Sequence, residues 1–309
     1  MQKVNLKNEE LTEQLSKVIE APRLLLDEPM SRHTTFAIGG PADYLVFPNK
    51  VEEVAKVISI AKGFNMPVLA LGNGSNILVR EKGIRALVIM FDENSGNITH
   101  AEHTVVAGAG ASLTDVSRYA AGQGLTGMEF AVGIPGSIGG AVFMNAGAYD
   151  GEMSKIVSAV TAICQDGTVK RFEGKEIHFS YRNSVFQENS CIVCEVEVLL
   201  SPGDKNAIQA KMDEFTTSRE SKQPLELPSA GSTFKRPPGY YAGTLIEQTG
   251  LKGLSVGGAQ VSEKHAGFIV NTGNATAQDV LSLISEVQRR VFDKFGVQLH
   301  PEVRILGEE

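Results

Sequence analysis

The spacing of apolar and polar residues predicts a chain in which helices and strands follow one another throughout. Apolar residues recur at helical spacing in residues 1–20, 48–64, 113–121, 204–219 and 240–250, and again from Thr276 to Val291. Short apolar and β-branched runs predict strands at residues 44–47, 67–70, 84–91, 104–108, 157–164, 169–172, 191–200 and 268–271, with a last strand after Glu302. This mixture is typical of an α+β fold.

The limits of the domains follow from where this pattern changes. Residues 201–204 (SPGD) form the clearest boundary, because they separate the last strand of a β-rich stretch from a helix with Ile208, Met212 and Phe215 on one face. We therefore expect three parts, at residues 1–70, 71–203 and 204–309.

Two glycine-rich loops are the first candidates for a binding site. Residues 133–149 (GIPGSIGGAVFMNAGAY) hold five glycines and no charged side chain, and residues 71–76 (LGNGSN) directly follow a predicted strand. Glycine lets the backbone approach a ligand closely, and consecutive N–H groups form a concavity that binds phosphate. A single loop of this kind is equally typical of a tight turn before a buried helix. Two such loops together favour an extended dinucleotide.

The dinucleotide is more like a flavin than a nicotinamide. Neither loop continues into the Gly-Lys-Ser/Thr of a P-loop, and neither completes the GxGxxG of a Rossmann fold. Residues 108–113 (GAGASL) begin such a motif but lack its third glycine.

Composition limits the class of protein. The 309 residues are 42% apolar and 21% charged, with a net charge of −7. These values are typical of a soluble globular protein, and the acidic balance argues against general nucleic-acid binding. Apolar runs stay well short of the roughly 18 residues that a membrane span requires, and the first residues are too charged for a signal peptide. We expect a cytoplasmic protein that binds neither nucleic acid nor membrane.

The three cysteines do not suggest a disulfide framework. Cys191 and Cys194 spell CxxC, but they fall in a predicted strand, where residues three apart point to opposite faces. We therefore expect neither a redox role nor a bound metal at this motif.

Several polar clusters suit an anionic small molecule. Tyr181 and Arg182 stand among small polar residues and aromatics, which is typical of a half-buried Arg that binds an anion. Residues 219–264 hold six Lys and Arg against four Asp and Glu, in an otherwise acidic chain. The alternatives are a structural Arg–carboxylate pair, solvated surface charge and, for His33, a purely structural role.

Six motifs point to one family: HTTFAIGGPAD (33–43), LGNGSNILV (71–79), GIPGSIGGAVFMNAGAY (133–149), SYRNSVF (180–186), AGSTFKRP (230–237) and HPEVRILG (300–307). In their order the chain resembles the UDP-N-acetylenolpyruvoylglucosamine reductases, flavoenzymes of bacterial peptidoglycan precursor synthesis. The likeness runs from about residue 30 to the end. The short segment after AGSTFKRP is similar to the shorter subclass, which lacks an inserted loop with a substrate-binding Tyr that stacks on uridine.

The resemblance implies an α+β fold of the FAD-linked oxidase type. Two FAD-binding subdomains would correspond to residues 1–70, with the N-terminal helix, and 71–203, and a substrate domain to 204–309. The implied reaction reduces the enolpyruvyl ether of UDP-N-acetylglucosamine enolpyruvate to UDP-N-acetylmuramate. FAD would be bound non-covalently, and NADPH would use the same site as the UDP-sugar in turn. The resemblance leaves the oligomeric state open.

Roles for individual residues follow from the same resemblance. Arg182 and Glu302 would stabilise the negative charge that develops when hydride reaches the vinyl carbon, and Ser232 would donate the proton. The implied FAD-binding residues are Gly72, Asn73, Gly74, Ser75, Asn76, Pro135, Gly136, Ser137, Gly139, Gly140, Val193 and Arg219. The implied substrate-binding residues are Tyr181, Arg182, Lys222, Lys235, Lys252 and Gln260.

Two alternatives remain at this level. One is another FAD-linked oxidase that uses oxygen and a small alcohol or lactone, although Ser232 and Glu302 would then have no task. The other is a regulator that binds a flavin or a nucleotide sugar without catalysis.

Overall fold

The computed structural model describes residues 8–309 and divides into two compact units. The first unit comprises the chain up to Asp27, Asp43–Asn73 and Ala86–Thr216, and the second comprises Glu28–Ala42, Gly74–Arg85 and Thr217–Glu309. The second unit thus takes in two segments from the first ninety residues, which contiguous domains would not share. The boundaries at residues 70 and 203 stay a prediction.

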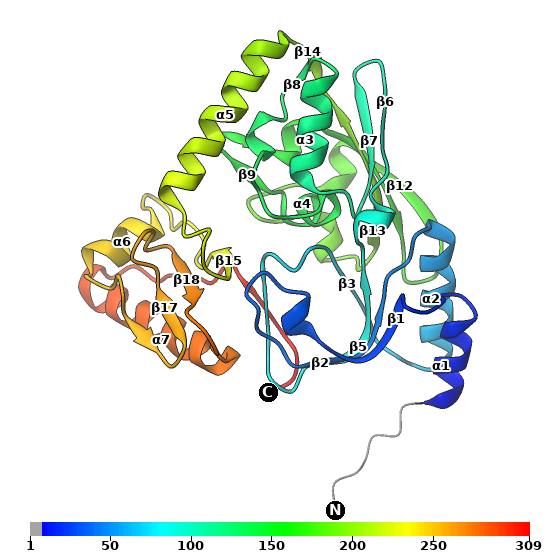
Figure 1. Ribbon diagram of the computed structural model, residues 1–309, viewed down its shortest axis with the longest axis horizontal. Helices are drawn as coiled ribbons and strands as arrows, with labels where there is room; N and C mark the ends of the chain where they lie inside the picture. Colours follow the sequence, from blue (N-terminus) through cyan, green and yellow to red (C-terminus); the bar gives the residue numbers. More distant parts are fainter. Residues whose placement is uncertain (1–7) are drawn as a thin grey trace, which may run out of the picture. The chain divides into compact units, whose positions relative to one another are not determined.

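The first sheet of the first unit has the strand order β1-β2-β5-β3. Its strands are β1 (Leu24–Pro29), β2 (Pro41–Val46), β5 (Ile84–Met90) and β3 (Val68–Leu71), and β3 runs parallel to β5. Helices α1 (Glu9–Ser16) and α2 (Val51–Gly63) lie side by side next to this sheet (Figure 1). Leu11 and Leu15 of α1 are fully buried in the same core as Val54 and Leu87, which explains the apolar spacing of the first predicted helix. The part of that prediction in residues 1–7 lies outside the described residues.

The second sheet of this unit is antiparallel, with the order β12-β11-β13-β7-β6. Its strands are β6 (Ile98–Ala101), β7 (Thr104–Gly108), β11 (Val157–Ile163), β12 (Val169–Glu173) and β13 (Ile192–Leu199). The turn predicted at Asp166 and Gly167 joins β11 to β12, with Gly167 at φ +86°. Helices α3 (Leu113–Gly122) and α4 (Ile138–Met144) bury their apolar residues in the core that this sheet shares with the first.

The structure corrects the expectation for the cysteines. Cys164 and Cys191 form a disulfide, with their Cα atoms 4.1 Å apart. The reason is the register of the antiparallel strands β11 and β13, in which Ile163 pairs with Ile192. Cys164, which follows Ile163, therefore lies opposite Cys191, which precedes Ile192. Cys194 is a buried free thiol, and burial raises its pKa to about 12. The CxxC motif does lie at a strand, as predicted.

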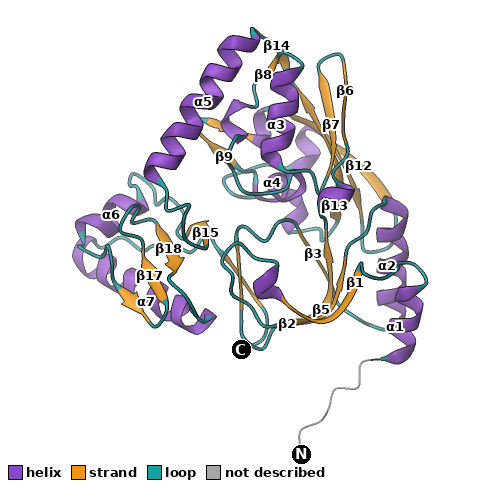
Figure 2. Ribbon diagram, viewed as in Figure 1, coloured by secondary structure: helices purple, strands orange, loops and turns teal. Residues whose placement is uncertain are grey.

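The second unit contains a four-stranded sheet and two helices beside it (Figure 2). The sheet order is β15-β18-β17-β16, formed by Ser229–Ser232, Phe268–Asn271, Ala259–Val261 and Ser255–Val256. Helix α6 (Ala242–Gln248) and helix α7 (Ala277–Phe295) bury Leu245, Ile246, Val280 and Ile284 in one core with residues of this sheet. The predicted capping box at Thr276 and Asp279 is confirmed at the start of α7.

Two strands from distant parts of the sequence also meet in the second unit. Strand β4 (Ile77–Val79) follows the LGNGSN loop and runs parallel to β19 (Arg304–Leu306) near the C-terminus. Leu78 and Val303 are buried in the same core as α6 and α7. This pair joins the LGNGSN loop to the segment that contains Glu302.

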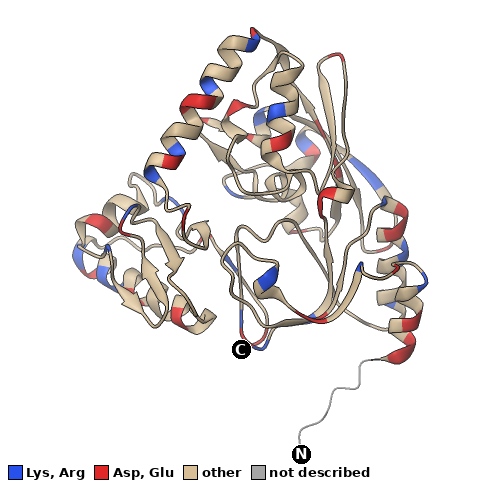
Figure 3. Cartoon of the chain, viewed as in Figure 1, with Lys and Arg blue, Asp and Glu red and all other residues tan. Residues whose placement is uncertain are grey.

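The remaining elements are short, except for one long helix. Helix α5 (Lys205–Lys222) crosses the division between the units at Thr216 and carries charges of both signs along its length (Figure 3). The short strands are β8 (Leu125–Thr126), β9 (Gly147–Ala148), β10 (Gly151–Glu152) and β14 (Ser201–Pro202). The 3-10 turns are Met30–Arg32, Glu93–Ser95, Glu129–Ala131, Met153–Lys155, Gly174–Ile177 and Val185–Gln187. The predicted α+β mixture is confirmed. Among the described helices, none has both the length and the apolar character needed to span a membrane.

Candidate active site

The two glycine-rich loops meet in the first unit. A Cβ placed on Gly72 would lie 2.2 Å from Ser137 Oγ and 3.8 Å from the backbone nitrogen of Gly140. Ser137 is the N-cap of α4, where its side chain accepts a hydrogen bond from Gly140 N. A Cβ at position 72 would displace this hydroxyl, so glycine lets two loops that are far apart in sequence approach closely while Ser137 caps α4.

A third small-residue loop supports this arrangement. The carbonyls of Ala109 and Ala111 accept hydrogen bonds from the amides of Gly139 and Ile138. A Cβ on Gly139 would lie only 2.8 Å from the Cβ of Ala109. The sequence analysis noted residues 108–113 only as an incomplete GxGxxG. Their alternation of glycine and alanine was the available signal for this close packing.

Tyr181 and Arg182 form the tip of a tight turn held against the end of α4. Ser180 and Asn183 exchange two backbone hydrogen bonds, of 3.0 and 3.1 Å. The side chain of Asn145 donates to the Ser180 carbonyl, and that of Gln187 donates to the Arg182 carbonyl. Arg182 is half-buried, as predicted, and its guanidinium lies 5.5 Å from the centre of the exposed Tyr181 ring. The SYRN motif is thus attached to the helix that begins in the second glycine loop.

Ser232 and Glu302 lie close together in the backbone network of the second unit. Glu302 N donates to the carbonyl of Thr233, the residue after Ser232, at 2.8 Å. Lys235 N donates to the His300 carbonyl, and Phe234 bridges to Pro301. The AGSTFKRP and HPEVRILG motifs therefore run side by side, and the exposed Ser232 neighbours the half-buried Glu302.

Asn76 joins the LGNGSN loop to this network. Its side-chain Nδ2 donates to the Glu302 carbonyl at 3.3 Å, and its own carbonyl accepts from Arg304 N at 3.0 Å. Because the division between the units falls between Asn73 and Gly74, Gly72 belongs to the first unit and Asn76 to the second.

The other predicted site residues differ in how they are placed. Arg219 is 9% exposed at the end of α5 and donates to Gln223, whereas Lys222 and Lys235 are exposed. Lys252 forms an ion pair with Glu247 at 2.6 Å, and Gln260 donates to the Gly253 carbonyl and to Ser255 Oγ. Val193 is buried in β13. Their roles in ligand binding stay predictions.

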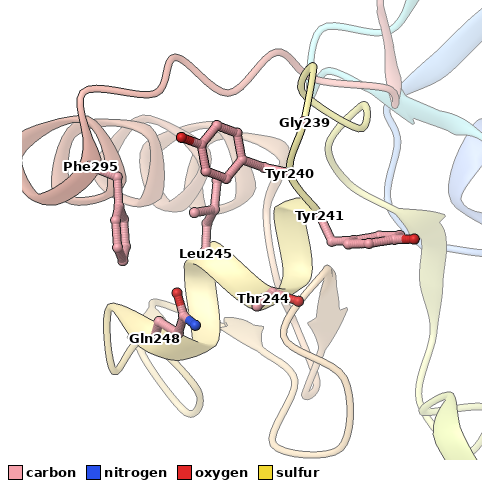
Figure 4. Close-up of a pocket in the computed structure, with 7 residues that line it drawn as sticks. All are labelled: Gly239, Tyr240, Tyr241, Thr244, Leu245, Gln248 and Phe295. Atoms are coloured by element: carbon pink, nitrogen blue, oxygen red, sulfur yellow. The ribbon is translucent and has the colours of Figure 1, made fainter.

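A pocket of about 320 Å³ in the second unit is lined by residues other than those predicted for the site. Figure 4 shows Tyr240, Leu245 and Phe295 facing the same space between α6 and α7, with the Gln248 amide at its edge. Tyr241 points to the opposite side of the start of α6. There the guanidinium carbon of Arg236 lies over its ring, 3.9 Å from the ring centre.

Comparison with known proteins decides the family. The chain is 46% identical over 306 residues to the UDP-N-acetylenolpyruvoylglucosamine reductase of Lachnoclostridium phytofermentans, covering 98% of this chain and 99% of that one. It is 48% identical over 299 residues to the reductase of the same name from Caldanaerobacter subterraneus, covering 97% of this chain and 99% of that one. The chain belongs to the UDP-N-acetylenolpyruvoylglucosamine reductase family. The recognition made from the six motifs is confirmed.

Family models and solved structures agree with this assignment. The model of the reductase C-terminal domain matches residues 223–306, and an FAD binding domain matches residues 42–173. The crystal structure of UDP-N-acetylenolpyruvylglucosamine reductase from Thermus caldophilus superimposes with a TM-score of 0.78 at 36% identity. It covers 92% of this chain and 98% of that one. An alkyldihydroxyacetonephosphate synthase, at 14% identity and a TM-score of 0.50, shares the fold alone. The FAD-linked oxidase type of fold is confirmed.

The glycine loops of this reductase fit the cofactor that its FAD binding domain implies. Gly72 and Gly139 allow the loops to pack so closely that a Cβ on either would collide with its neighbour. Loops built of glycine and other small residues let a ligand approach the backbone closely, which suits the pyrophosphate of FAD. Residues 71–76 and 135–140 are the segments that would hold it.

Proposed function

We propose that this chain reduces the enolpyruvyl ether of UDP-N-acetylglucosamine enolpyruvate to UDP-N-acetylmuramate, with NADPH as the electron donor. The chain is an oxidoreductase of the reductase family and has an FAD binding domain. FAD, when bound, accepts hydride from NADPH and transfers it to the terminal vinyl carbon of the substrate. The observation that supports the proposal most is the 46–50% identity to these reductases over nearly the whole chain.

Arg182 is proposed to bind the carboxylate of the enolpyruvyl group. Its guanidinium is half-buried on the turn held by Asn145 and Gln187, so its backbone is fixed before substrate arrives. A guanidinium offers a planar fork of donors that matches a carboxylate. Hydride addition at the vinyl carbon pushes negative charge onto the adjacent carbon and this carboxylate, which Arg182 would stabilise as it develops.

Ser232 is proposed to donate the proton that completes the reduction. A hydroxyl is a weak acid in water, but a carbon that carries developing negative charge is basic enough to take its proton. The network that joins Thr233 to Glu302 supports a shared task for Ser232 and Glu302, in which Glu302 stabilises the same charge. Lys222, Lys235, Lys252, Gln260 and Tyr181 remain proposed contacts of the UDP-sugar, and Val193 and Arg219 of the cofactor.

The location of the enzyme is also part of the proposal. We infer a cytoplasmic enzyme from the short apolar runs of the chain. The family resemblance implies that NADPH and the UDP-sugar use the same site in turn, which would explain why neither glycine loop matches a nicotinamide fingerprint.

An anaerobic visible spectrum of the purified protein tests the whole reaction. NADPH should bleach the flavin absorbance, and UDP-N-acetylglucosamine enolpyruvate added afterwards should restore it. Bleaching without recovery would retain a flavoenzyme but reject the substrate, in favour of an FAD-linked oxidase with another acceptor. Flavin that NADPH cannot bleach would favour a regulator without catalysis.

Replacing Ser232 tests its individual role. Ser232→Ala should leave the bleaching by NADPH intact and abolish recovery, because only the second half-reaction needs the proton. Ser285→Ala, an exposed serine on α7, is the matched control and should behave as wild type. Equal slowing of both half-reactions in Ser232→Ala would show that Ser232 is not the proton donor.

A further inference from the structure

Strand β15, which carries Ser232, has a bulge directly before this residue. In the pairing of β15 with β18, Ser229 faces Val270 and Ser232 faces Phe268, with a register shift between them. Two residues of β15, Ala230 and Gly231, thus stand opposite one residue of β18, and Gly231 has φ +72°. Bulges of this kind redirect side chains, so the direction of the Ser232 hydroxyl depends on how both ends of the bulge are fixed.

The downstream end of the bulge is fixed by Thr233. Its backbone N–H donates to the Gly267 carbonyl at 2.8 Å. Its hydroxyl accepts a hydrogen bond from Ile269 N at 3.0 Å, and the side chain is 4% exposed. The sheet itself therefore holds this end.

The upstream end of the bulge pairs with β18, where Asn271 N donates to the Pro228 carbonyl at 2.8 Å. It is also held by Thr35, from a part of the chain almost two hundred residues earlier. Ser229 N donates to the Thr35 carbonyl at 3.1 Å, and Thr35 Oγ1 donates to the Ser229 carbonyl at 2.7 Å. Thr35 N in turn donates to the carbonyl of Gly74 at 3.2 Å. One residue thus bonds both to the start of the bulged strand and to the LGNGSN loop, and Thr35, Gly74 and Ser229 all belong to the second unit.

The segment around Thr35 is itself rigidly held. The buried side chain of Asn271 donates to the Phe36 carbonyl at 3.1 Å, and the Phe36 ring is 1% exposed. Thr34 Oγ1 bonds to the carbonyl of Ile38 at 3.0 Å. Position 74 accepts only glycine here, because its φ is +62° and a Cβ would lie 2.2 Å from the His33 carbonyl. The segment around Thr35 and its partner Gly74 are therefore both constrained.

We propose that Thr35 is a positioning residue, whose hydroxyl fixes the register of the Ser232 strand relative to the LGNGSN loop and so aims the proton donor. This inference rests on the proposed function, because it assigns Ser232 the proton transfer. Thr35 does not touch the reacting atoms in this scheme. It acts through Ser229 and the bulge.

The test replaces the hydroxyl while keeping the shape of the side chain. Thr35→Val removes the bond to Ser229, whereas Thr35→Ser keeps the donor. Thr272→Val is the matched control, because Thr272 is also exposed, lies in the same unit and donates its hydroxyl to a backbone carbonyl, that of Gly258. Thr35 is exposed as well, so water can replace its lost bond and the thermal unfolding midpoint should stay close to that of wild type.

We expect Thr35→Val to affect only one of the two half-reactions. Flavin reduction by NADPH should be unchanged in Thr35→Val, while reoxidation by the enolpyruvyl substrate slows about tenfold, as expected for a misplaced reacting group. The solvent deuterium isotope effect on reoxidation should increase, since proton transfer becomes more rate-limiting. Thr35→Ser and Thr272→Val should match wild type.

Hydrogen exchange gives a readout that does not depend on activity. In Thr35→Val, the amides of residues 229–233 should exchange faster than in wild type, and Thr35→Ser should restore their protection. The inference would be overturned if Thr35→Val were reoxidised at the wild-type rate, or if Thr35→Ser were slowed as much as Thr35→Val. Slowing of both half-reactions in Thr35→Val would also overturn it.

Failure of the proposed function would look different. If Ser232→Ala, measured in parallel, were reoxidised normally, the proton-donor assignment would fall for reasons independent of Thr35. If Ser232→Ala is blocked while Thr35→Val behaves as wild type, only the positioning role is lost.

Discussion

Arg182 stands in a backbone conformation that non-glycine residues rarely adopt, with φ +54°. The left-handed region costs roughly 1 kcal/mol or more for a residue with a Cβ. Reciprocal hydrogen bonds between Ser180 and Asn183, together with the side chains of Asn145 and Gln187, hold the turn in this conformation. Strain of this kind is often retained where a side chain must point in one direction.

We predict that Arg182→Lys impairs the second half-reaction far more than the first. Lysine keeps the positive charge but cannot form the two parallel hydrogen bonds of a guanidinium to a carboxylate. Flavin reoxidation should slow by about 100-fold or more, the usual effect of losing one group that stabilises developing charge. Anaerobic stopped-flow measurement of both half-reactions checks this. Arg171→Lys, in a surface ion pair with Glu197, is the control, and unchanged turnover in Arg182→Lys would remove Arg182 from the site.

At the residue scale, sequence reasoning was limited by contacts that only folding creates. The half-burial of Arg182 was predictable because its polar and aromatic neighbours are adjacent in sequence. The Cys164–Cys191 disulfide was not, because it depends on the register of two strands separated by a hairpin and a long loop. Thr35 was also missed, since its partners Gly74 and Ser229 lie far along the chain.

At the scale of elements, Gly72 of the LGNGSN loop leaves room for the side chain that caps α4. We predict that Gly72→Ala weakens FAD binding, because the new Cβ would meet Ser137 Oγ at 2.2 Å and displace it from its hydrogen bond with Gly140 N. Gly63→Ala is the control, since a Cβ at that position of α2 meets nothing within 4 Å. Titration of the apoprotein with FAD, followed by flavin fluorescence, measures both. Equal affinity in Gly72→Ala and wild type would contradict the role of this close approach.

Helix α7 depends on its capping box. Thr276 Oγ1 accepts from Asp279 N at 3.0 Å, and Asp279 Oδ2 accepts from Thr276 N at 3.0 Å. We predict that Thr276→Ala lowers the free energy of unfolding by about 1 kcal/mol, the usual cost of losing an N-cap. Urea unfolding measures the change. Thr276→Ser should recover most of it, and failure to do so would point to the threonine methyl group instead.

The same capping box makes the free energy of unfolding depend on pH at acidic pH. The hydrogen bond from the Thr276 backbone, above all, lowers the pKa of Asp279 below its ordinary value. Because the pKa is depressed in the folded state, the stabilisation is present above the pKa of the unfolded chain and is lost as the pH falls through the folded-state pKa. Unfolding of Asp279→Asn should therefore depend less on pH than wild type below about pH 4, near the pKa of an unperturbed Asp. Identical pH profiles would contradict this.

Elements with strong local signals were predicted well. The periodicity of α2 and α7, the capping box and the turn at Gly167 all depend on residues within a few positions of one another. What could not be predicted is how the second unit assembles. Residues 28–42 join it through hydrogen bonds to the C-terminal part, and residues 74–85 join it through strand pairing. Such pairing leaves no periodic pattern in the segments themselves.

For the whole molecule, FAD should act as a stabilising ligand. A ligand that binds only the folded chain, at about 100 times its dissociation constant, adds about 2.7 kcal/mol to the free energy of unfolding. For a chain of this size we predict a rise of roughly 4 °C in the thermal unfolding midpoint. Differential scanning fluorimetry of the apoprotein across FAD concentrations checks this. A midpoint that does not change with FAD would contradict cofactor binding by the glycine loops.

The disulfide leaves Cys194 as the sole titratable thiol of the chain, whose three cysteines all lie in the described residues. Burial in β13 and a pKa of about 12 keep that thiol both shielded and protonated at neutral pH. A thiol-specific reagent can therefore modify the native protein only in the moments when β13 separates from its neighbours. The rate of labelling at Cys194 would consequently report how often β13 opens. The chain thus contains a built-in probe of local unfolding in the sheet β12-β11-β13-β7-β6.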